Sequence, residues 1–409
     1  MRFLFVHQNC PGQYVHYLRH LLARGGHEVF FLTAPNSNEI PGLRKVNYLP
    51  QGASTPGIHP DAVDFESGMI RARSAHDRAL QLAGMGMRPD VIIGHNGWGE
   101  MLHMRDIWPQ TPSIAYFEFF YQSHGLDVDF DPEFPMAPEK RAQVRVKNAI
   151  NLLGLEATTI GQTPTYFQRA TYPPWAQDKI EMIPEGAALE MFRPDRAASF
   201  ALPAARRRWR ASSGRRLLSF VARNLEPYRG FHVMLRALPA ILAATPDLDV
   251  VLVGSDGVSY GAACPSGSWK AHFLAEVGPR LDLRRVFFAG HLEYGEYRRL
   301  LQVSAAHVYL TYPFVASWSL REALATGCAI IGSDTEPVRE FLTHEQNGLL
   351  VPFHDAAALA EAVTRVLADA ALAERLRAAA RDFAIAHLDL AQHLAAMDGL
   401  VARVTGMQP

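Results

Sequence analysis

The stretch "HVYLTYPFVASWSLREALATGCAIIGSD" (His307–Asp334) contains one complete strand–helix–strand unit. An apolar strand ends near Pro313, a Ser/Trp loop follows, and the pattern predicts a helix from Ser319 that Gly327 ends before a second apolar strand. Parallel strands joined by a helix form an α/β sheet, whose ligands bind beyond the carboxyl ends of the strands. The loop and the helix start therefore lie where a ligand site is expected.

One carboxylate in this stretch, Glu322, admits two interpretations. The segment Ser319–Glu322 fits a capping box, in which the glutamate accepts a hydrogen bond from the backbone N–H of the cap residue. Alternatively, free N–H groups at the helix start hold phosphate oxygens, and Glu322 accepts hydrogen bonds from a ribose diol. The two are compatible if an arriving ligand releases the cap.

The alternation of strands and helices extends along the whole chain. Apolar runs predict strands over residues 2–8, 28–34, 46–50, 90–95, 113–119, 157–162, 179–185, 217–223, 249–255, 285–291, 307–313, 329–334 and 348–352. Runs without strict alternation suit parallel strands that are covered on both faces. Two successive series of such units predict an α/β protein with two Rossmann-like, doubly wound domains that face each other across a cleft.

The composition changes near the middle of the chain. The segment "FRPDRAASFALPAARRRWRASSGRR" (Phe192–Arg216) is rich in Arg, Ala and Ser, and we interpret it as a connection with one short helix at most. We expect an N-terminal domain over 1–190 and a C-terminal domain over 191–387. Residues 388–409 are expected to form a C-terminal helix that packs back towards the N-terminal domain.

The bulk composition limits the class of protein. The chain has 409 residues, with 40 Lys plus Arg against 41 Asp plus Glu, so no overall charge attracts nucleic acid. Its three cysteines, Cys10, Cys264 and Cys328, are widely spaced, which favours a reducing compartment over a disulfide framework. No apolar run is long enough to span a bilayer. We expect a cytoplasmic protein, with peripheral contact at the inner face of the membrane left open.

Common nucleotide and metal motifs are absent from the sequence. There is neither G-x-G-x-x-G nor a Walker A sequence, which disfavours redox cofactors and P-loop phosphoryl transfer. The turn "NCPGQ" (Asn9–Gln13) still carries Gly12, which either lets the backbone approach a ligand or makes a tight turn. In "DVDFDPE", Pro132 stands where a calcium loop requires glycine, and no metal site is expected.

Two arginines follow the first strand of the second series. In "FVARNLEPYRGF", Arg223 ends a strand and Arg229 ends the following loop, so both guanidiniums would project over the carboxyl edge of the sheet. Two permanently charged, forked donors suit a diphosphate. A pair of surface arginines is the alternative interpretation.

With these motifs, the chain resembles the retaining glycosyltransferases of family 4, which have two Rossmann-like domains in the GT-B arrangement. "KIEMIPEGAALEMFRPD" is similar to the hinge-side segment of that family, with Glu185 where asparagine is common. "ARNLEPYRGF" matches the spacing of G-R-x-x-x-x-K-G-x, which implies that Arg223 and Arg229 bind the donor diphosphate. The start "FVHQNCPGQY" and the tripeptide "SWS" resemble a bacterial subgroup of the family that begins F-x-H-Q-N-x-P-G-Q.

The E-x(7)-E element of the family falls on the opening stretch. Its second glutamate is Glu322, which the resemblance assigns to the nucleotide ribose, and Ser317, Trp318 and Ser319 would lie beside it with Gly12 in the nucleotide site. Its first glutamate is replaced by Phe314, whose ring either lines the sugar pocket or packs at the strand end. This departure leaves the donor sugar open.

In the N-terminal half the resemblance is less specific. A histidine of the family falls near Glu118 here, and Glu118 and His95 are the candidates for substrate contact on this side, where the family binds its acceptor.

The resemblance implies retaining, metal-independent transfer of a sugar from a UDP- or GDP-sugar to a hydroxyl acceptor, in glycan, polysaccharide or glycolipid biosynthesis, without a further cofactor. A nucleotide-sugar 2-epimerase or hydrolase on the same fold, and a non-catalytic nucleotide-sugar-binding relative, are the alternatives.

Overall fold

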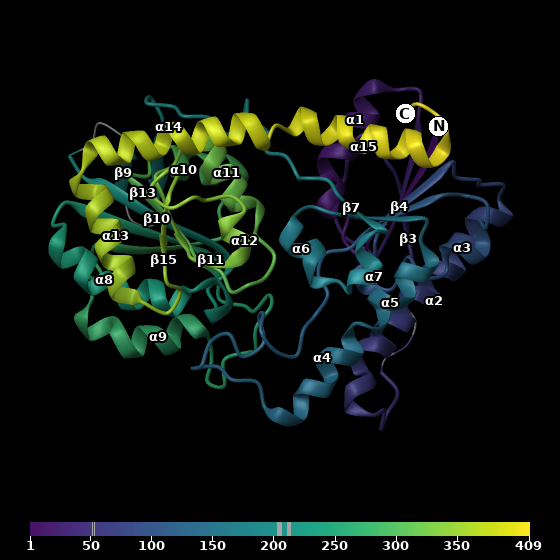
Figure 1. Ribbon diagram of the computed structural model, residues 1–409, viewed down its shortest axis with the longest axis horizontal. Helices are drawn as coiled ribbons and strands as arrows, with labels where there is room; N and C mark the ends of the chain where they lie inside the picture. Colours follow the sequence, from purple (N-terminus) through teal and green to yellow (C-terminus); the bar gives the residue numbers. More distant parts are fainter. Residues whose placement is uncertain (51, 53, 203–206, 211–213) are drawn as a thin grey trace. The chain divides into compact units, whose positions relative to one another are not determined.

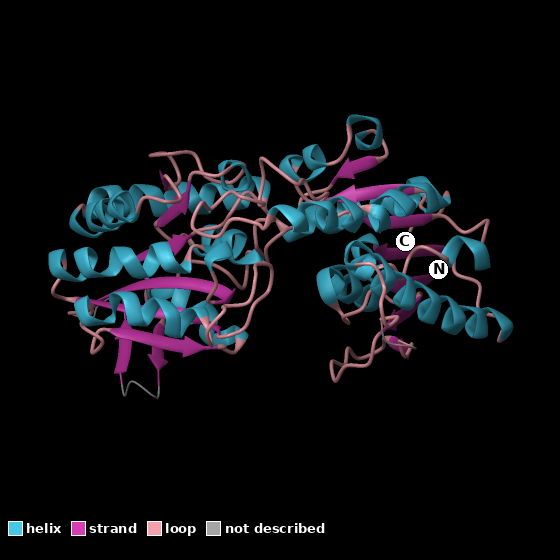
Figure 2. Cartoon of the chain, turned by 90° about the horizontal axis from the view of Figure 1, so that it is seen from below, coloured by secondary structure: helices cyan, strands magenta, loops and turns pink. Residues whose placement is uncertain are grey.

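The computed structural model describes residues 1–50, 52, 54–202, 207–210 and 214–409, and the chain divides into two compact units (Figure 1). Unit 1 comprises Met1–Glu185 and Ala391–Pro409, and unit 2 comprises Gly186–Leu390. Each unit is built on its own parallel sheet with helices around it (Figure 2). The prediction of two Rossmann-like α/β domains is therefore confirmed.

Unit 1 contains a seven-stranded sheet in the order β3-β2-β1-β4-β5-β6-β7, with every neighbouring pair parallel. Its strands are β1 (Arg2–Val6), β2 (Glu28–Thr33), β3 (Arg44–Asn47), β4 (Val91–His95), β5 (Ser113–Tyr116), β6 (Ile160–Thr163) and β7 (Ile180–Met182). Each of these strands was predicted, although β5 and β7 are shorter than expected.

Helices cover both faces of this sheet because both faces are apolar. Along β1, Phe3 and Phe5 pack on one face, while Leu4 and Val6 pack on the other. The first face is covered by α1 and α15, and the second by α2 and α5. The helices of this unit are α1 (Val15–Arg24), α2 (Val63–Gly84), α3 (Met104–Ile107), α4 (Arg141–Lys147), α5 (Ala149–Ala157), α6 (Tyr166–Thr171), α7 (Pro174–Gln177) and α15 (Leu390–Thr405).

The last helix, α15, is fixed to the first helix, α1, by one carboxylate. Asp398 accepts hydrogen bonds from Tyr17 Oη (3.0 Å), His20 Nε2 (2.9 Å) and Arg24 Nη1 (2.7 Å). Met397 and Leu400 of α15 belong to the same apolar cluster as β1. The two ends of the chain therefore share one core.

Unit 2 contains a six-stranded parallel sheet in the order β12-β11-β10-β13-β14-β15. Its strands are β10 (Arg216–Asn224), β11 (Leu248–Ser255), β12 (Val286–Gly290), β13 (Ala306–Tyr309), β14 (Ile330–Ser333) and β15 (Leu349–Val351). Its helices are α8 (Phe231–Ala244), α9 (Trp269–Val277), α10 (Tyr294–Val303), α11 (Trp318–Thr326), α12 (Glu336–Arg339), α13 (Ala356–Ala368) and α14 (Ala370–His387). These strands, too, were predicted.

The interpretation of Phe192–Arg216 as a connection without strands was wrong. The segment forms β8 (Ser199–Leu202) and β9 (Arg207–Arg210), which pair antiparallel, while residues 203–206 and 211–213 of that interpretation lie outside the described residues. Phe200 and Trp209 stack with ring centroids 5.7 Å apart and join the apolar cluster of β10 and β11. Burial of these two aromatic side chains therefore packs the Arg-rich segment against the sheet of unit 2.

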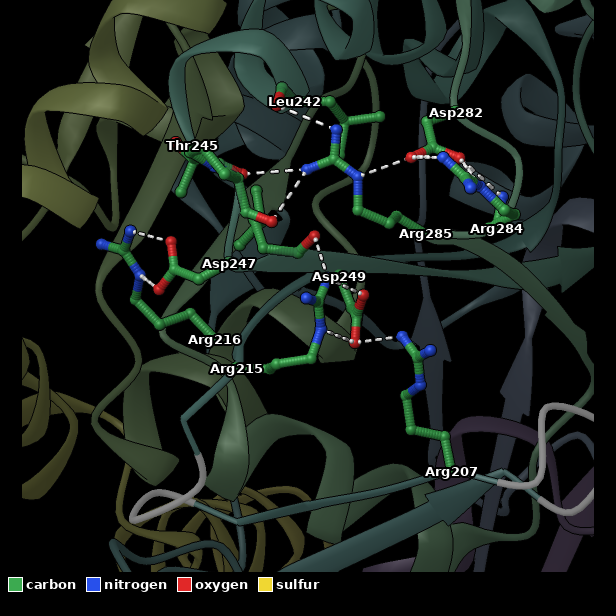
Figure 3. A network of polar contacts seen from close by, with 12 residues as sticks. Arg207, Arg215, Arg216, Leu242, Thr245, Asp247, Asp249, Asp282, Arg284 and Arg285 are labelled. Atoms are coloured by element: carbon green, nitrogen blue, oxygen red, sulfur yellow. Dashed lines mark hydrogen bonds and ion pairs between the residues drawn. The ribbon is translucent and has the colours of Figure 1, made fainter.

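A buried carboxylate also anchors β9 (Figure 3). Asp249, the second residue of β11, accepts hydrogen bonds from Arg207 Nη1 (2.7 Å) and Arg215 Nη2 (2.7 Å). It also accepts one from Trp209 Nε1 (2.9 Å). These donors outweigh the effect of burial and hold the pKa of the Asp249 carboxyl below its usual value. The network lies at the amino ends of the strands, away from the edge where ligands bind.

The chain enters and leaves unit 2 along neighbouring segments. Ala187 N donates to Leu388 O (2.7 Å), and Leu390 N donates to Ala187 O (3.2 Å). Among the described residues, no helix is long and apolar enough to cross a membrane.

Candidate active site

Each sheet has one point at which the order of its strands reverses. In unit 2 this switch point lies between β10 and β13, and in unit 1 it lies between β1 and β4. Ligands of doubly wound sheets bind beyond the carboxyl ends of the strands at such points. The two switch points are therefore where the predicted site residues are to be sought.

In unit 2, β10 leads through a tight turn into α8. Gly230 precedes the helix with φ of 69°, and a Cβ on it would lie 2.4 Å from Leu310 Cβ. Any other residue would meet both backbone strain and a collision with the strand end of β13. Glycine thus lets the arginine loop approach the loop that follows β13.

The two predicted arginines lie at this switch point in different environments. Arg223 is exposed near the end of β10. Arg229 is buried, and its Nη1 donates to Thr311 Oγ1 (2.7 Å) and to Val315 O (3.1 Å). Its guanidinium also lies over the ring of Tyr260, 4.9 Å from the centroid. Arg229 therefore shapes the loop after β13 as well as placing a charge beside it.

Glu226 was missed by the sequence analysis. Its buried carboxylate accepts hydrogen bonds from the backbone N–H groups of three consecutive residues, Ser259 (3.1 Å), Tyr260 (3.3 Å) and Gly261 (3.2 Å). This clamp brings the loop after β11 to the switch point and positions Tyr260 against Arg229. No local motif identifies the partner loop, which lies more than thirty residues further along the chain.

Phe314, which stands in place of the first family glutamate, packs inside an aromatic cluster. Its ring is 3% exposed and lies 5.3 Å from the ring of Tyr228 at 84°, and 5.0 Å from that of Tyr260. Of the two interpretations offered, packing at the strand end is the one that these contacts support.

The start of α11 carries backbone N–H groups and two serine hydroxyls, and some of these groups are hydrogen-bonded within the protein. Ser317 is the N-cap, and its backbone N–H donates to Tyr309 Oη (2.8 Å). Ser317 and Ser319 share a hydrogen bond of 2.6 Å between their hydroxyls, and Trp318, like them, is half-buried. Neither serine side chain caps the helix, so the remaining N–H groups of the first turn can receive an anion.

The capping-box interpretation of Glu322 was wrong. Its carboxylate is 7% exposed and turns to α10, where Tyr297 Oη donates to Oε2 (2.8 Å) and Tyr294 Oη donates to Oε1. Burial raises the pKa of the Glu322 carboxyl, and the two phenol donors partly offset that effect. These tyrosines were also missed, since they precede Glu322 by more than twenty residues.

The other predicted residues, Gly12, His95 and Glu118, belong to unit 1. His95 ends β4, and its Nε2 lies 3.6 Å from Glu118 Oε2, beyond hydrogen-bond distance. Gly12 has φ of 53°, and a Cβ on it would lie 3.0 Å from His7 Cε1. Gly12 therefore packs against His7, the residue that follows β1 and that sequence reasoning did not single out.

His7 and His95 form a pair across the switch point of unit 1. Their rings are 5.1 Å apart at 89°, and each Nδ1 accepts a backbone N–H, from Asn9 (2.7 Å) and Gly97 (2.9 Å) respectively. An accepting Nδ1 places the proton on Nε2, so both rings are neutral Nε2–H donors. Both Nε2 atoms are buried without a hydrogen-bond partner among the described residues. Burial, aided by His95, lowers the pKa of His7 to about 3.

Family comparisons agree with this division of the chain. Residues 25–192 match the glycosyl transferase family 4 group, and residues 203–383 match glycosyl transferases group 1. Together the two matches extend over most of the chain. The fold and both matches define the class: the chain is a glycosyltransferase with the GT-B fold.

Individual relatives fall within the same class. The chain is 25% identical to the glycogen synthase of Mycobacterium tuberculosis over 411 residues, covering 93% of this chain and 89% of that protein. It is 32% identical to the phosphatidyl-myo-inositol mannosyltransferase of Mycolicibacterium smegmatis over 164 residues, covering 38% of this chain and 36% of that protein.

Solved structures share the fold over nearly the full chain. Sucrose-phosphate synthase from Thermosynechococcus elongatus superposes with a TM-score of 0.71 at 20% identity, covering 99% of both chains. HepE of Anabaena, in complex with UDP and glucose, gives a TM-score of 0.66 at 14% identity, covering 98% of this chain and 100% of that one.

Proposed function

We propose that the protein transfers a sugar from a nucleoside-diphosphate sugar to a hydroxyl acceptor, with retention of configuration and without a metal ion. The observation that carries the proposal is the arrangement at the switch point of unit 2. There, Arg223, Arg229 and the uncapped start of α11 surround the carboxyl ends of β10 and β13. Cationic forks and the backbone N–H groups of a helix start are donors that suit a diphosphate.

These groups act on the leaving group. As the bond between the anomeric carbon and the diphosphate breaks, negative charge grows on the diphosphate oxygens. Fixed donors that are already oriented stabilise that charge without reorganising, and one such donor contributes on the order of 3–4 kcal/mol to the transition state. In a retaining reaction the acceptor attacks the face that the leaving group vacates, so a phosphate oxygen can take the acceptor proton. No dedicated protein base is then required.

We assign the acceptor to unit 1, beyond the ends of β1 and β4. The Nε2–H groups of His7 and His95 can donate to a hydroxyl oxygen, and the nearby carboxylate of Glu118 can accept from the same hydroxyl. Neutral imidazoles beside a carboxylate suit a neutral, polyhydroxylated acceptor.

The relatives guide the choice of substrates. HepE was solved with UDP-glucose, and two relatives are named glycogen synthase and phosphatidyl-myo-inositol mannosyltransferase. UDP- and GDP-sugars, with glycan or glycolipid acceptors, are therefore the first candidates for substrates. The F-x-H-Q-N-x-P-G-Q start supports placing the chain in the family 4 subgroup that begins in this way, and this placement fits the same assignment. Cys10, Cys264 and Cys328 are free thiols, which fits a reaction in the cytoplasm or at its membrane surface.

Nucleotide binding provides the first test. The melting temperature of the protein is measured with UDP, GDP, ADP and CDP, each with and without EDTA. We expect one nucleotide to raise it and the rise to survive EDTA. No stabilisation by any of the four would contradict the proposal, and loss of the effect in EDTA would contradict metal independence.

Product analysis then decides the reaction. With the sugar of the binding nucleotide, we expect a glycosylated acceptor whose anomeric configuration, by NMR, equals that of the donor. An isomerised donor would instead indicate an epimerase, free sugar alone a hydrolase, and binding without turnover a non-catalytic relative.

A further inference from the structure

The carboxylate of Glu322 is held by two hydroxyl groups of α10. Tyr297 donates to Oε2 and Tyr294 donates to Oε1, so each carboxylate oxygen already has an O–H donor. Burying a carboxylate without hydrogen-bond donors costs free energy. The two phenol hydroxyls donate the hydrogen bonds that water would otherwise supply to this carboxylate.

The two tyrosines differ in how firmly they are held. Tyr297 is buried, whereas Tyr294 is 48% exposed and is the first residue of α10. Phe192 packs edge-on against Tyr294 at 5.3 Å and lies 6.0 Å from Tyr297. If Tyr294 rotates, its hydroxyl can turn to water, while the hydroxyl of Tyr297 has no such route.

A ribose offers the same chemical group that Tyr294 offers. Its vicinal hydroxyls are O–H donors, which can take the place of a phenol donor on one oxygen of the buried carboxylate. Oε1 of Glu322, which accepts from the exposed Tyr294, is the oxygen that can lose its donor. The Tyr294 hydroxyl can bond to water once it has left Oε1.

We propose that Tyr294 is an internal substitute for a ribose hydroxyl: it occupies Glu322 Oε1 in the free protein and is displaced when a nucleoside diphosphate binds. Tyr297 stays on Oε2 and is a positioning residue for the carboxylate. This inference rests on the proposed function, and it assigns opposite roles to two neighbouring tyrosines.

Opposite roles give opposite effects on affinity. Tyr294→Phe removes the competing hydroxyl and leaves the ring, so a nucleoside diphosphate should bind about 3- to 10-fold more tightly, the equivalent of one ordinary hydrogen bond. Tyr297→Phe removes the donor that orients the carboxylate, so the same ligand should bind roughly 10-fold more weakly.

The experiment is calorimetric titration of both variants with UDP, GDP, ADP and CDP, followed by the 2′,3′-dideoxy analogue of the nucleotide that binds. The dideoxy analogue lacks the competing groups, so the gain in Tyr294→Phe should vanish for it. Tyr166→Phe, at a tyrosine of unit 1 that is 64% exposed, is the matched control and should bind like the wild type.

The outcomes separate the inference from the function on which it rests. Weaker or unchanged binding in Tyr294→Phe, or an equal gain for the dideoxy analogue, would overturn the role of Tyr294 while leaving the proposed function intact. If none of the four nucleotides binds the wild type or the variants, the proposed function is overturned and this inference with it.

Discussion

At the scale of single residues, burial separates two arginines that the sequence presents as a pair. Arg223 is exposed, whereas Arg229 is buried and bonded to Thr311 and Val315. The proposed function gives both arginines a role at the diphosphate. Arg229 in addition supports the structure of the loop after β13.

Alanine at each position should reveal this difference. Arg223→Ala should lower kcat by roughly 30- to 1000-fold, the equivalent of about 2–4 kcal/mol of transition-state stabilisation, at an unchanged melting temperature. Arg229→Ala should lower both kcat and the melting temperature, because Thr311 Oγ1 and the carbonyl of Val315 lose their donor. Steady-state kinetics and thermal unfolding measure the two effects. Near-normal turnover in Arg223→Ala would remove that residue from the diphosphate site.

Phe314→Glu should damage the fold without changing the choice of sugar. The ring is enclosed by Tyr228 and Tyr260, so a carboxylate there would be buried among aromatic rings and would lower the free energy of unfolding by roughly 3–5 kcal/mol. Phe314→Leu, which stays apolar, should cost less. Denaturant unfolding is measured beside kcat/KM for a panel of nucleotide sugars. A shifted sugar preference at unchanged stability would place the ring in the sugar pocket instead.

The residues that sequence reasoning found are those with fixed local spacing, and those it missed act across long separations. Arg229, Ser317 and Glu322 are identified by their distance from a strand end or a helix start. Glu226 acts on a loop 33 residues away, and Tyr294 reaches Glu322 over 28 residues, so only the tertiary fold brings them together.

At the scale of secondary-structure elements, the parallel strands were predictable because they are buried on both faces and appear as continuous apolar runs. The pair β8 and β9 was not predictable on that basis. Its burial rests on a few apolar residues, Phe200 and Trp209 among them, within an Arg-rich segment, and on the single carboxylate of Asp249.

Asp249→Asn should loosen β9 without affecting catalysis. The variant removes the buried charge that Arg207 and Arg215 share, and breaking a buried pair from one side costs about 3–5 kcal/mol. We expect about 3 kcal/mol, because both arginines are partly exposed and can be hydrated. Glu374→Gln, which alters the pair between Arg377 and a carboxylate that is 63% exposed, is the control and should change stability little. Denaturant unfolding tests this, and equal stability of the two variants would contradict it.

At the scale of the whole molecule, each unit contains a histidine that burial keeps neutral. Burial lowers the pKa of His7 in unit 1 to about 3 and that of His307 in unit 2 to about 4, from a usual value of 6.5. Below pH 6.5 the unfolded chain therefore binds protons that the folded chain does not bind.

The contribution of these two histidines to the free energy of unfolding should fall as the pH drops from 6.5 towards 4. Each of the two histidines contributes a slope of up to about 1.4 kcal/mol per pH unit, and the loss ends only below the folded pKa values. The pKa of the buried Asp249 carboxyl is lowered, so its contribution to the free energy of unfolding is lost only below about pH 3.8. Urea unfolding at several pH values, with His307→Asn for comparison, measures the slope. An equally steep slope in His307→Asn would exclude His307 as a source.

The shared core of α1 and α15 has a consequence for how the protein is made. Residues of unit 1 that lie at the start and at the end of the chain are separated during translation by the whole of unit 2. While the ribosome is still producing unit 2, the apolar face formed by Phe3, Phe5 and Leu18 has no α15 to cover it. A nascent chain stalled before Ala391 should therefore recruit chaperones at that face, and release of the last helix should end the recruitment.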